Sequence, residues 1–141
     1  MSARTKARKR ALDLLYGADV RGVPAAELLV EEGRRAAGEP ARESSWRYAR
    51  EIVQGVIDHR DELDRAILDH AHGWSLSRMP HIDRAIIRIG AWEILHNEEV
   101  PDAVAIAEAV ESATVLSTDD SAGFVNGVLA AIAREHGTPA S

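Results

Sequence analysis

Residues 82–95 read IDRAIIRIGAWEIL, and their pattern sets the fold class. The apolar residues recur at helical spacing around nearly the whole circumference, and Pro80 just before them suits the start of a helix. A helix that is apolar on almost every side has to be covered by other elements. The pattern therefore predicts a central helix that is buried among its neighbours.

The rest of the chain shows helical spacing too, and no run of β-branched residues alternates with polar residues between turn signals. We therefore predict an all-α protein, a compact helical bundle. Gly, Pro, Ser and Asp residues mark the breaks between the helices. The expected helices span about 3–20, 24–36, 44–67 and beyond (one long helix or two in sequence), 80–95, 101–116 and 118–137, with the clearest loop at 37–43.

The length of 141 residues suits a single domain spanning 1–141, in which roughly two-thirds of the unfolded chain's surface becomes buried. The chain contains no cysteine, which excludes a disulfide framework and a thiolate zinc site. No apolar run approaches the ~20 residues that span a bilayer, and no signal-peptide core follows the start. We expect a cytoplasmic protein with no membrane partner.

Positive charge is concentrated at the amino end of an otherwise acidic chain. The whole sequence has 17 Lys and Arg against 23 Asp and Glu, yet five of its first ten residues are basic and none is acidic. These five are Arg4, Lys6, Arg8, Lys9 and Arg10. Nucleic acid binding depends on local positive potential, so the acidic pI of about 5.5 does not exclude it. Cations at a helix start also oppose the helix dipole, and a phosphate ligand would relieve that conflict.

Arg4 and Arg8 fall on the same helical stripe as Ala11 and Leu15, which face the core further along. We therefore expect these first turns not to lie over packed hydrophobic groups, but to project past the core or line a groove. Contact with RNA or DNA is the functional interpretation of the cluster. A frayed, solvated helix start is the alternative.

Four blocks carry a family resemblance. Three of them, beginning at residue 82, read IDRAIIRIGAWEIL, VPDAVAIAEAVE and DDSAGFVNGVL, and the fourth reads RxxALDLLY from Arg8 to Tyr16. In this order and spacing they resemble the NusB family of bacterial transcription antitermination factors. The resemblance covers most of the chain, is weakest over about 21–44, and is most specific in FVNGVL.

The resemblance implies a fold of about seven helices in two sub-bundles, and a function in binding and not in catalysis. NusB-like proteins pair with the ribosomal small-subunit protein NusE, and the pair holds the boxA element of nascent ribosomal RNA leaders. It then helps to assemble a complex with other Nus factors on RNA polymerase that reads through terminators. Some NusB-like proteins self-associate, so a homodimer is left open.

The expected RNA site is a groove between the first helix and the start of the last. Its expected residues are Arg4, Lys6, Arg8, Lys9, Arg10, Tyr16, Arg88, Asp120 and Phe124, with Asp83 on the side facing NusE. Aromatic rings stack on single-stranded bases, and a carboxylate accepts hydrogen bonds from base amino groups.

Several of these residues have a structural alternative. Tyr16 and Phe124 could be core rings, and Asp120 could only complement the dipole of its helix. Arg88 could form an internal ion pair, for which Glu93, Glu108 and Glu111 are the candidate partners. For Gly127, inside a helix, close packing is favoured over close RNA approach.

Three departures from the family pattern affect the carboxyl half. Ala107 replaces the usual Asn, Asp102 and Ala103 replace a common Tyr-Lys pair, and Gly123 replaces the usual basic residue before Phe124. The last two changes remove cations. These losses make the amino-terminal cations more important for RNA affinity.

Signals for catalysis are missing. His70 and His72 point apart on a helix, and Glu108 and Glu111 have no histidine at ligand spacing, so we expect neither a metal site nor a cofactor. Two other functions compete with antitermination. One is a stand-alone NusB-like domain of a ribosomal RNA methyltransferase system, and the other is a module that binds only protein.

Overall fold

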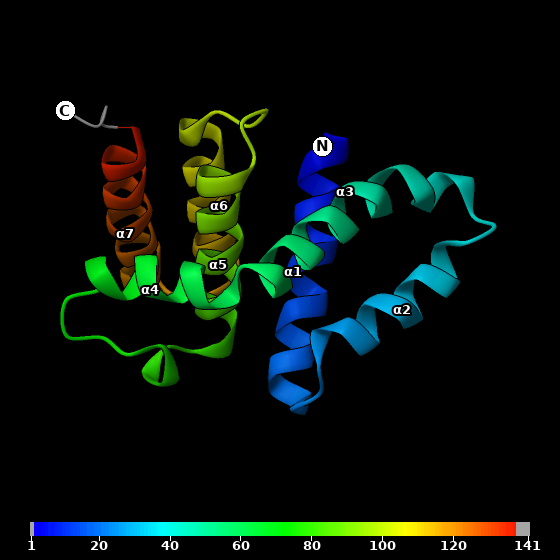
Figure 1. Ribbon diagram of the computed structural model, residues 1–141, viewed down its shortest axis with the longest axis horizontal. Helices are drawn as coiled ribbons and strands as arrows, with labels where there is room; N and C mark the ends of the chain where they lie inside the picture. Colours follow the sequence, from blue (N-terminus) through cyan, green and yellow to red (C-terminus); the bar gives the residue numbers. More distant parts are fainter. Residues whose placement is uncertain (1, 138–141) are drawn as a thin grey trace. The chain divides into compact units, whose positions relative to one another are not determined.

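The computed structural model describes residues 2–137, apart from the side chain of Ala41. This part of the chain is all-α, as predicted, with seven α-helices and one short 3-10 helix (Figure 1). The elements are α1 (Ala3–Arg21), α2 (Ala25–Ala36), α3 (Pro40–Asp58), α4 (Arg60–His70), η1 (Leu76–Arg78), α5 (His81–His96), α6 (Asp102–Leu116) and α7 (Asp119–Gly137). None of these helices has the length and apolar character needed to cross a membrane.

The helices group into two compact units that divide between Asp58 and His59. The first unit contains α1 to α3, and the second contains α4 to α7. The division agrees with the two sub-bundles that the family resemblance implies. The segment after residue 44 was predicted to form one long helix or two in sequence. It forms two, α3 and α4, with His59 between them.

In the first unit, α1 packs against α3, and α2 packs against both. Small and apolar side chains fill the contact: Ala7, Ala11 and Leu12 of α1 and Ala49, Ile52 and Val53 of α3 are all buried. The Ser2 hydroxyl caps α1 by accepting a hydrogen bond from the Thr5 N–H. Gly22 ends the helix with a φ of 67°, a left-handed conformation that glycine adopts without strain.

The start of α3 differs from the prediction. The helix begins at Pro40 and not at residue 44, so the loop spans only 37–39. Proline fits the first turn because its missing N–H would have no partner there, and Glu43 adds a favourable negative charge. The Ser45 hydroxyl donates to the Arg42 carbonyl, 3.2 Å away within the helix.

In the second unit, α5 is the central helix that its sequence predicted. Every residue from 85 to 94 is buried, and α4, α6 and α7 all pack against it. Figure 1 shows α5, α6 and α7 running side by side, with α4 lying across α5 and α7. The alanines of α6 at four-residue spacing, Ala105, Ala109 and Ala113, are its buried residues. This alanine stripe leaves Leu116, the last residue of α6, 48% exposed.

Two glycines of the second unit differ in their surroundings. A Cβ on Gly90 would lie 2.5 Å from Leu129 Cδ1 and 3.5 Å from the Ala109 Cβ. Gly90 therefore lets α5 approach its neighbours closely. A Cβ on Gly127 would meet nothing within 4 Å among the described residues, so the packing interpretation of Gly127 was wrong.

These surroundings predict opposite stability changes for one added methyl group. We expect Gly90→Ala to lower the free energy of unfolding by about 1–3 kcal/mol, because Leu129 is fully buried and must shift. Gly127→Ala, its matched control, should raise that free energy by up to about 1 kcal/mol through helix propensity. Urea unfolding followed by circular dichroism measures both values. A Gly90→Ala protein as stable as the wild type would contradict the close approach.

Candidate nucleic-acid interface

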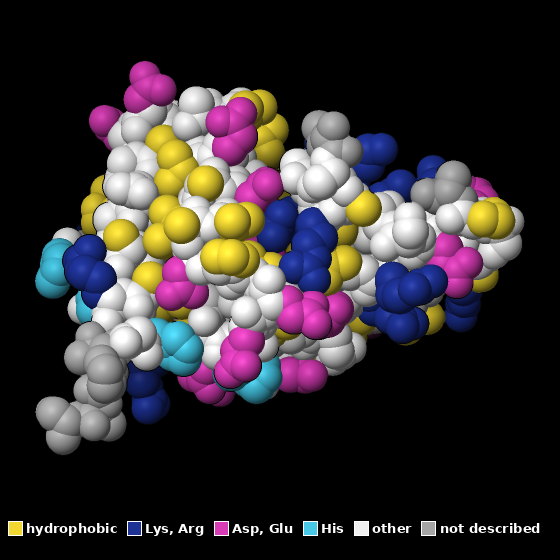
Figure 2. All heavy atoms as spheres, turned by 90° about the horizontal axis from the view of Figure 1, so that it is seen from above, with side chains coloured by type: hydrophobic (Ala, Val, Ile, Leu, Met, Phe, Trp, Pro, Cys, Tyr) yellow, Lys and Arg dark blue, Asp and Glu magenta, His cyan; other side chains and the backbone are white. Residues whose placement is uncertain are grey.

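Charge is distributed unevenly between the two units. Residues 1–58 carry 11 Lys and Arg against 9 Asp and Glu, whereas residues 59–141 carry 6 against 14. Most of the Lys and Arg side chains visible in Figure 2 lie over the helices of the first unit. A polyanion is therefore attracted to the first unit and repelled by the second.

Arg4 and Arg8 of α1 pack against an aromatic ring of α3. Their guanidinium carbons lie 4.9 Å and 5.9 Å from the centroid of the Tyr48 ring, which is within range for cation–π attraction. Arg8 is only 8% exposed. The expectation that these turns avoid packed groups was therefore wrong, because the π face of Tyr48 accommodates cations where an aliphatic side chain would not.

Lys6, Lys9 and Arg10 lie on the other side of α1. At about 100° per residue they fall within one third of the helix circumference, opposite Arg4 and Arg8. Both lysines are exposed and Arg10 is half-buried. The structure thus separates the five predicted cations into two that pack on Tyr48 and three that face outward, which we call the outer cations.

Tyr16 shares the outward face of α1 with the outer cations, since it lies two turns beyond Lys9. Tyr16 is 37% exposed, which agrees with a stacking surface and also with the alternative of a core ring that exposes its hydroxyl. The combination of three cations with an exposed aromatic ring supplies the two features that single-stranded nucleic acid binding uses: positive field and a stacking surface.

Asp13 interrupts this face with a negative charge. It lines a pocket of about 320 Å³ in the first unit, whose other charged and aromatic lining residues are Arg10, Arg21, Arg35, Glu31, Glu32 and Trp46. Burial raises the pKa of the Asp13 carboxyl, and the nearby Lys9 ammonium opposes that rise. Asp13 therefore reduces the positive field on this face of α1.

The predicted residues of α7 lie together in the second unit. Asp120 and Phe124 line one pocket of about 290 Å³, as their spacing of one helical turn suggested. The Trp74 ring lines it too, with its centroid 5.7 Å from that of Phe124. Phe124 is half-buried and Asp120 is exposed, so this aromatic pocket is open to a ligand. Sequence reasoning missed Trp74, although an aromatic residue directly after Gly73 was a usable signal.

Asp83 was predicted to lie on the side facing NusE. It lines the same pocket as Asp120 and Phe124 and is buried there. It is 5% exposed, and its Oδ2 accepts a hydrogen bond of 2.7 Å from the Ser121 hydroxyl. Its other oxygen, Oδ1, is buried and has no hydrogen-bond partner within residues 2–137 as the structure describes them. A role for Asp83 in binding NusE remains a prediction.

Arg88 forms an internal ion pair, but with a partner that the sequence did not indicate. Its Nε and Nη2 donate to the two carboxylate oxygens of Asp64 on α4, at 2.8 Å and 3.1 Å. The Arg88 side chain is 10% exposed and that of Asp64 is 22% exposed. The bidentate geometry is typical of a strong Arg–carboxylate pair. Asp64 takes the place of the expected partners Glu93, Glu108 and Glu111.

The predicted site residues therefore fall into two sets, one in each unit. The first set is on α1: Arg4, Lys6, Arg8, Lys9, Arg10 and Tyr16. The second set is Arg88 of α5 with Asp120 and Phe124 of α7. Arg88 does not line the pocket of Asp120 and Phe124, since its guanidinium is directed to α4.

Comparison with known proteins points to one family over most of the chain. The model of the NusB family matches residues 5–134. The transcription antitermination protein NusB of Leifsonia xyli subsp. xyli is 69% identical over 134 residues, which cover 95% of this chain and 93% of that protein.

Solved structures agree with this match. The structure of NusB from T. maritima is similar with a TM-score of 0.81 and 28% identity, covering 98% of this chain and 95% of that one. A NusB chain in a crystal structure of the antitermination factors NusB and NusE with double-stranded RNA is similar with a TM-score of 0.79 and 27% identity, covering 96% of this chain and 98% of that one. On the family match, the sequence identity and the helical fold together, this chain belongs to the NusB family.

Proposed function

We propose that the protein is a transcription antitermination factor that binds boxA RNA of nascent ribosomal RNA leaders together with the ribosomal protein NusE. The observation that carries the proposal is the outward face of α1, where Lys6, Lys9 and Arg10 lie beside the exposed Tyr16. Cations supply contacts to phosphates, and the ring offers a stacking surface for a base. The acidic second unit limits binding elsewhere on the chain.

The family supports the choice of partners. The related NusB of the solved complex assembles with NusE and double-stranded RNA. The relative from Leifsonia, which matches this chain over nearly its full length, is named as a transcription antitermination protein. Those names favour antitermination over a methyltransferase-associated domain or a protein-only module. In this proposal the protein acts in the cytoplasm by binding, as part of the elongation complex of RNA polymerase and other Nus factors, and not by catalysis.

The pocket of Asp120 and Phe124 would contribute base contacts of its own. Phe124 and Trp74 offer ring faces, and the Asp120 carboxylate accepts hydrogen bonds from an amino group.

The direct test is a fluorescence titration of the full chain against boxA RNA and a scrambled RNA of equal length, with and without NusE. We expect the chain to prefer boxA, NusE to strengthen binding, and affinity to fall as salt rises. Equal affinity for both RNAs, or binding insensitive to salt, would reject the proposal. Binding to NusE alone with no RNA affinity would identify a protein-only module.

A further inference from the structure

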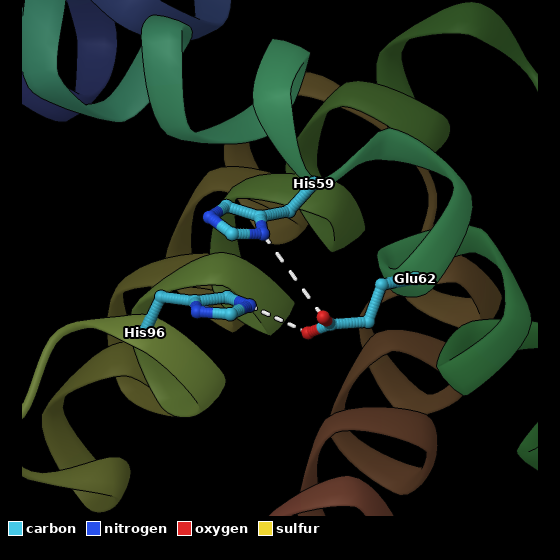
Figure 3. Close-up of side chains that lie close together, drawn as sticks. All are labelled: His59, Glu62 and His96. Atoms are coloured by element: carbon cyan, nitrogen blue, oxygen red, sulfur yellow. Dashed lines mark hydrogen bonds and ion pairs between the residues drawn. The ribbon is translucent and has the colours of Figure 1, made fainter.

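Three potential metal ligands meet in the second unit, outside the residues considered for RNA. His59 directly precedes α4, Glu62 lies in its first turn, and His96 is the last residue of α5. Figure 3 shows both imidazole rings turned toward the Glu62 carboxylate. His96 Nε2 lies 2.5 Å from Glu62 Oε1, and His59 Nδ1 lies 4.0 Å from Glu62 Oε2.

One donor atom from each of the three residues can be chosen so that all lie within 4.8 Å of one another. The two imidazole rings are stacked, with centroids 3.8 Å apart and planes inclined by 18°. No other group of three such ligands occurs among the described residues. Sequence reasoning missed the cluster because Glu62 and His96 are 34 residues apart on different helices.

The packing of α4 against α5 holds the three residues in place. Leu63 and Ile67 of α4 are fully buried, and the Asp64–Arg88 ion pair ties the two helices two turns before His96. Glu62 is the neighbour of Leu63, so its backbone position is fixed while its side chain remains 55% exposed. Such a frame positions the donors and leaves the carboxylate free to adjust.

The donor set suits a particular class of ion. Two imidazole nitrogens and one carboxylate oxygen are a ligand set of zinc sites that keep a fourth position for water. Mg²⁺ and Ca²⁺ prefer oxygen ligands and would be poorly held by two imidazoles. Ligands on a tetrahedral Zn²⁺ lie about 3.3 Å apart, given bond lengths near 2.0 Å. On binding the ion, His96 Nε2 and Glu62 Oε1 would therefore move apart by less than about 1 Å, and His59 Nδ1 would move closer to the Glu62 carboxylate. The two imidazole rings would turn out of their stack.

We propose that His59, Glu62 and His96 bind a divalent transition-metal ion, with Zn²⁺ the best match, and that the ion ties the start of α4 to the end of α5. Bound metal favours the folded state over the unfolded state, since the three ligands come together only on folding. The second unit then gains stability in the presence of the ion. The proposal does not depend on RNA binding.

The chain supplies a matched control. His70 Nε2 lies 2.7 Å from Glu135 Oε2, which repeats the pairing of His96 with Glu62, but this pair has no third ligand within the distances of the cluster among the described residues. Glu135 is 71% exposed, which makes it more accessible than Glu62 at 55%. A histidine–carboxylate pair alone is therefore available for comparison in the same unit.

The test is calorimetric titration of the untagged full chain with ZnCl₂, for the wild type and for His96→Gln, Glu62→Gln and His70→Gln. We expect one ion per chain, binding weakened at least about tenfold by the first two changes, and no change from His70→Gln. Absorption of bound Co²⁺ should show the intensity typical of four-coordinate nitrogen and oxygen ligation in the wild type and in His70→Gln, but not in His96→Gln or Glu62→Gln. Zn²⁺ should also raise the Tm of the wild type and of His70→Gln.

Either of two results would overturn the proposal. One is the absence of saturable Zn²⁺ binding to the wild type. The other is equal binding in wild type and Glu62→Gln, which would move the ion to other ligands. Because Glu62 is exposed, Glu62→Gln should fold as the wild type does, and circular dichroism checks this.

Discussion

Replacing the outer cations Lys6, Lys9 and Arg10 with alanine should weaken boxA RNA binding on the order of 10- to 100-fold at moderate salt. Each lost cation removes a phosphate contact and the counterion release that accompanies it. The slope of log affinity against log salt should become shallower by about 0.7 per lost contact with single-stranded RNA. Thermal stability should stay unchanged or rise slightly, because cations in the first turns of a helix oppose its dipole. Fluorescence anisotropy over a salt series measures affinity and slope together.

The matched control removes the same charge from the same unit. Arg34, Arg47 and Arg50 lie on α2 and α3 and are exposed, so changing all three to alanine alters the net charge equally. We expect this control to lower RNA affinity much less than the α1 variant. Equal losses would mean that the overall charge of the unit binds RNA, and not the outward face of α1.

Breaking the Asp64–Arg88 pair should have the largest effect on stability. We expect Asp64→Ala to lower the free energy of unfolding by about 2–3 kcal/mol, because it leaves the Arg88 guanidinium buried without its carboxylate. The value is below that for a fully buried pair, since Asp64 is 22% exposed. Urea unfolding of the variant measures it.

A double-mutant cycle separates the energy of the Asp64–Arg88 interaction from the cost of burying the Arg88 guanidinium without a partner. The Asp64→Ala, Arg88→Met protein should be more stable than Asp64→Ala alone, since methionine removes the uncompensated charge. Arg60, whose guanidinium Nε lies 4.0 Å from Asp64 and whose side chain is 46% exposed, gives the control: Arg60→Ala should cost at most about 1 kcal/mol. An Asp64→Ala protein of wild-type stability would contradict this interpretation of the pair.

The Arg88→Met variant also tests whether Arg88 contacts RNA or serves only the ion pair. If it serves only the ion pair, Arg88→Met lowers stability and leaves RNA affinity unchanged. If Arg88 contacts RNA as well, affinity falls by more than the loss of folded protein explains. The bidentate contact with Asp64 favours the first outcome.

The order and extent of the helices could be predicted because each depends on nearby residues. The glycine after α1, the prolines before α5 and α6, and the apolar spacing of α5 are local signals that the structure reproduces. The start of α3 was misplaced because Pro40 and Ser44 are both acceptable at a helix start. Only the tertiary contacts of the folded chain decide between such competing local signals.

The residues of the site could be predicted from the sequence, but the contacts between them could not. The five cations were evident from composition, whereas their separation by the Tyr48 ring depends on how α1 packs against α3. The partner of Arg88 and the cluster around Glu62 each join residues more than 20 positions apart. Such contacts follow from helix packing, which periodicity within one helix does not specify.

Cross-linking of the bound RNA addresses most directly whether α1 is the docking surface. Ultraviolet irradiation of the complex of this chain, NusE and boxA RNA, followed by mass spectrometry, identifies the peptides in contact with the RNA. We predict cross-links within residues 2–21, including Tyr16, that disappear when Lys6, Lys9 and Arg10 are replaced. Cross-links confined to other helices, with α1 unprotected from proteolysis in the complex, would contradict the assignment.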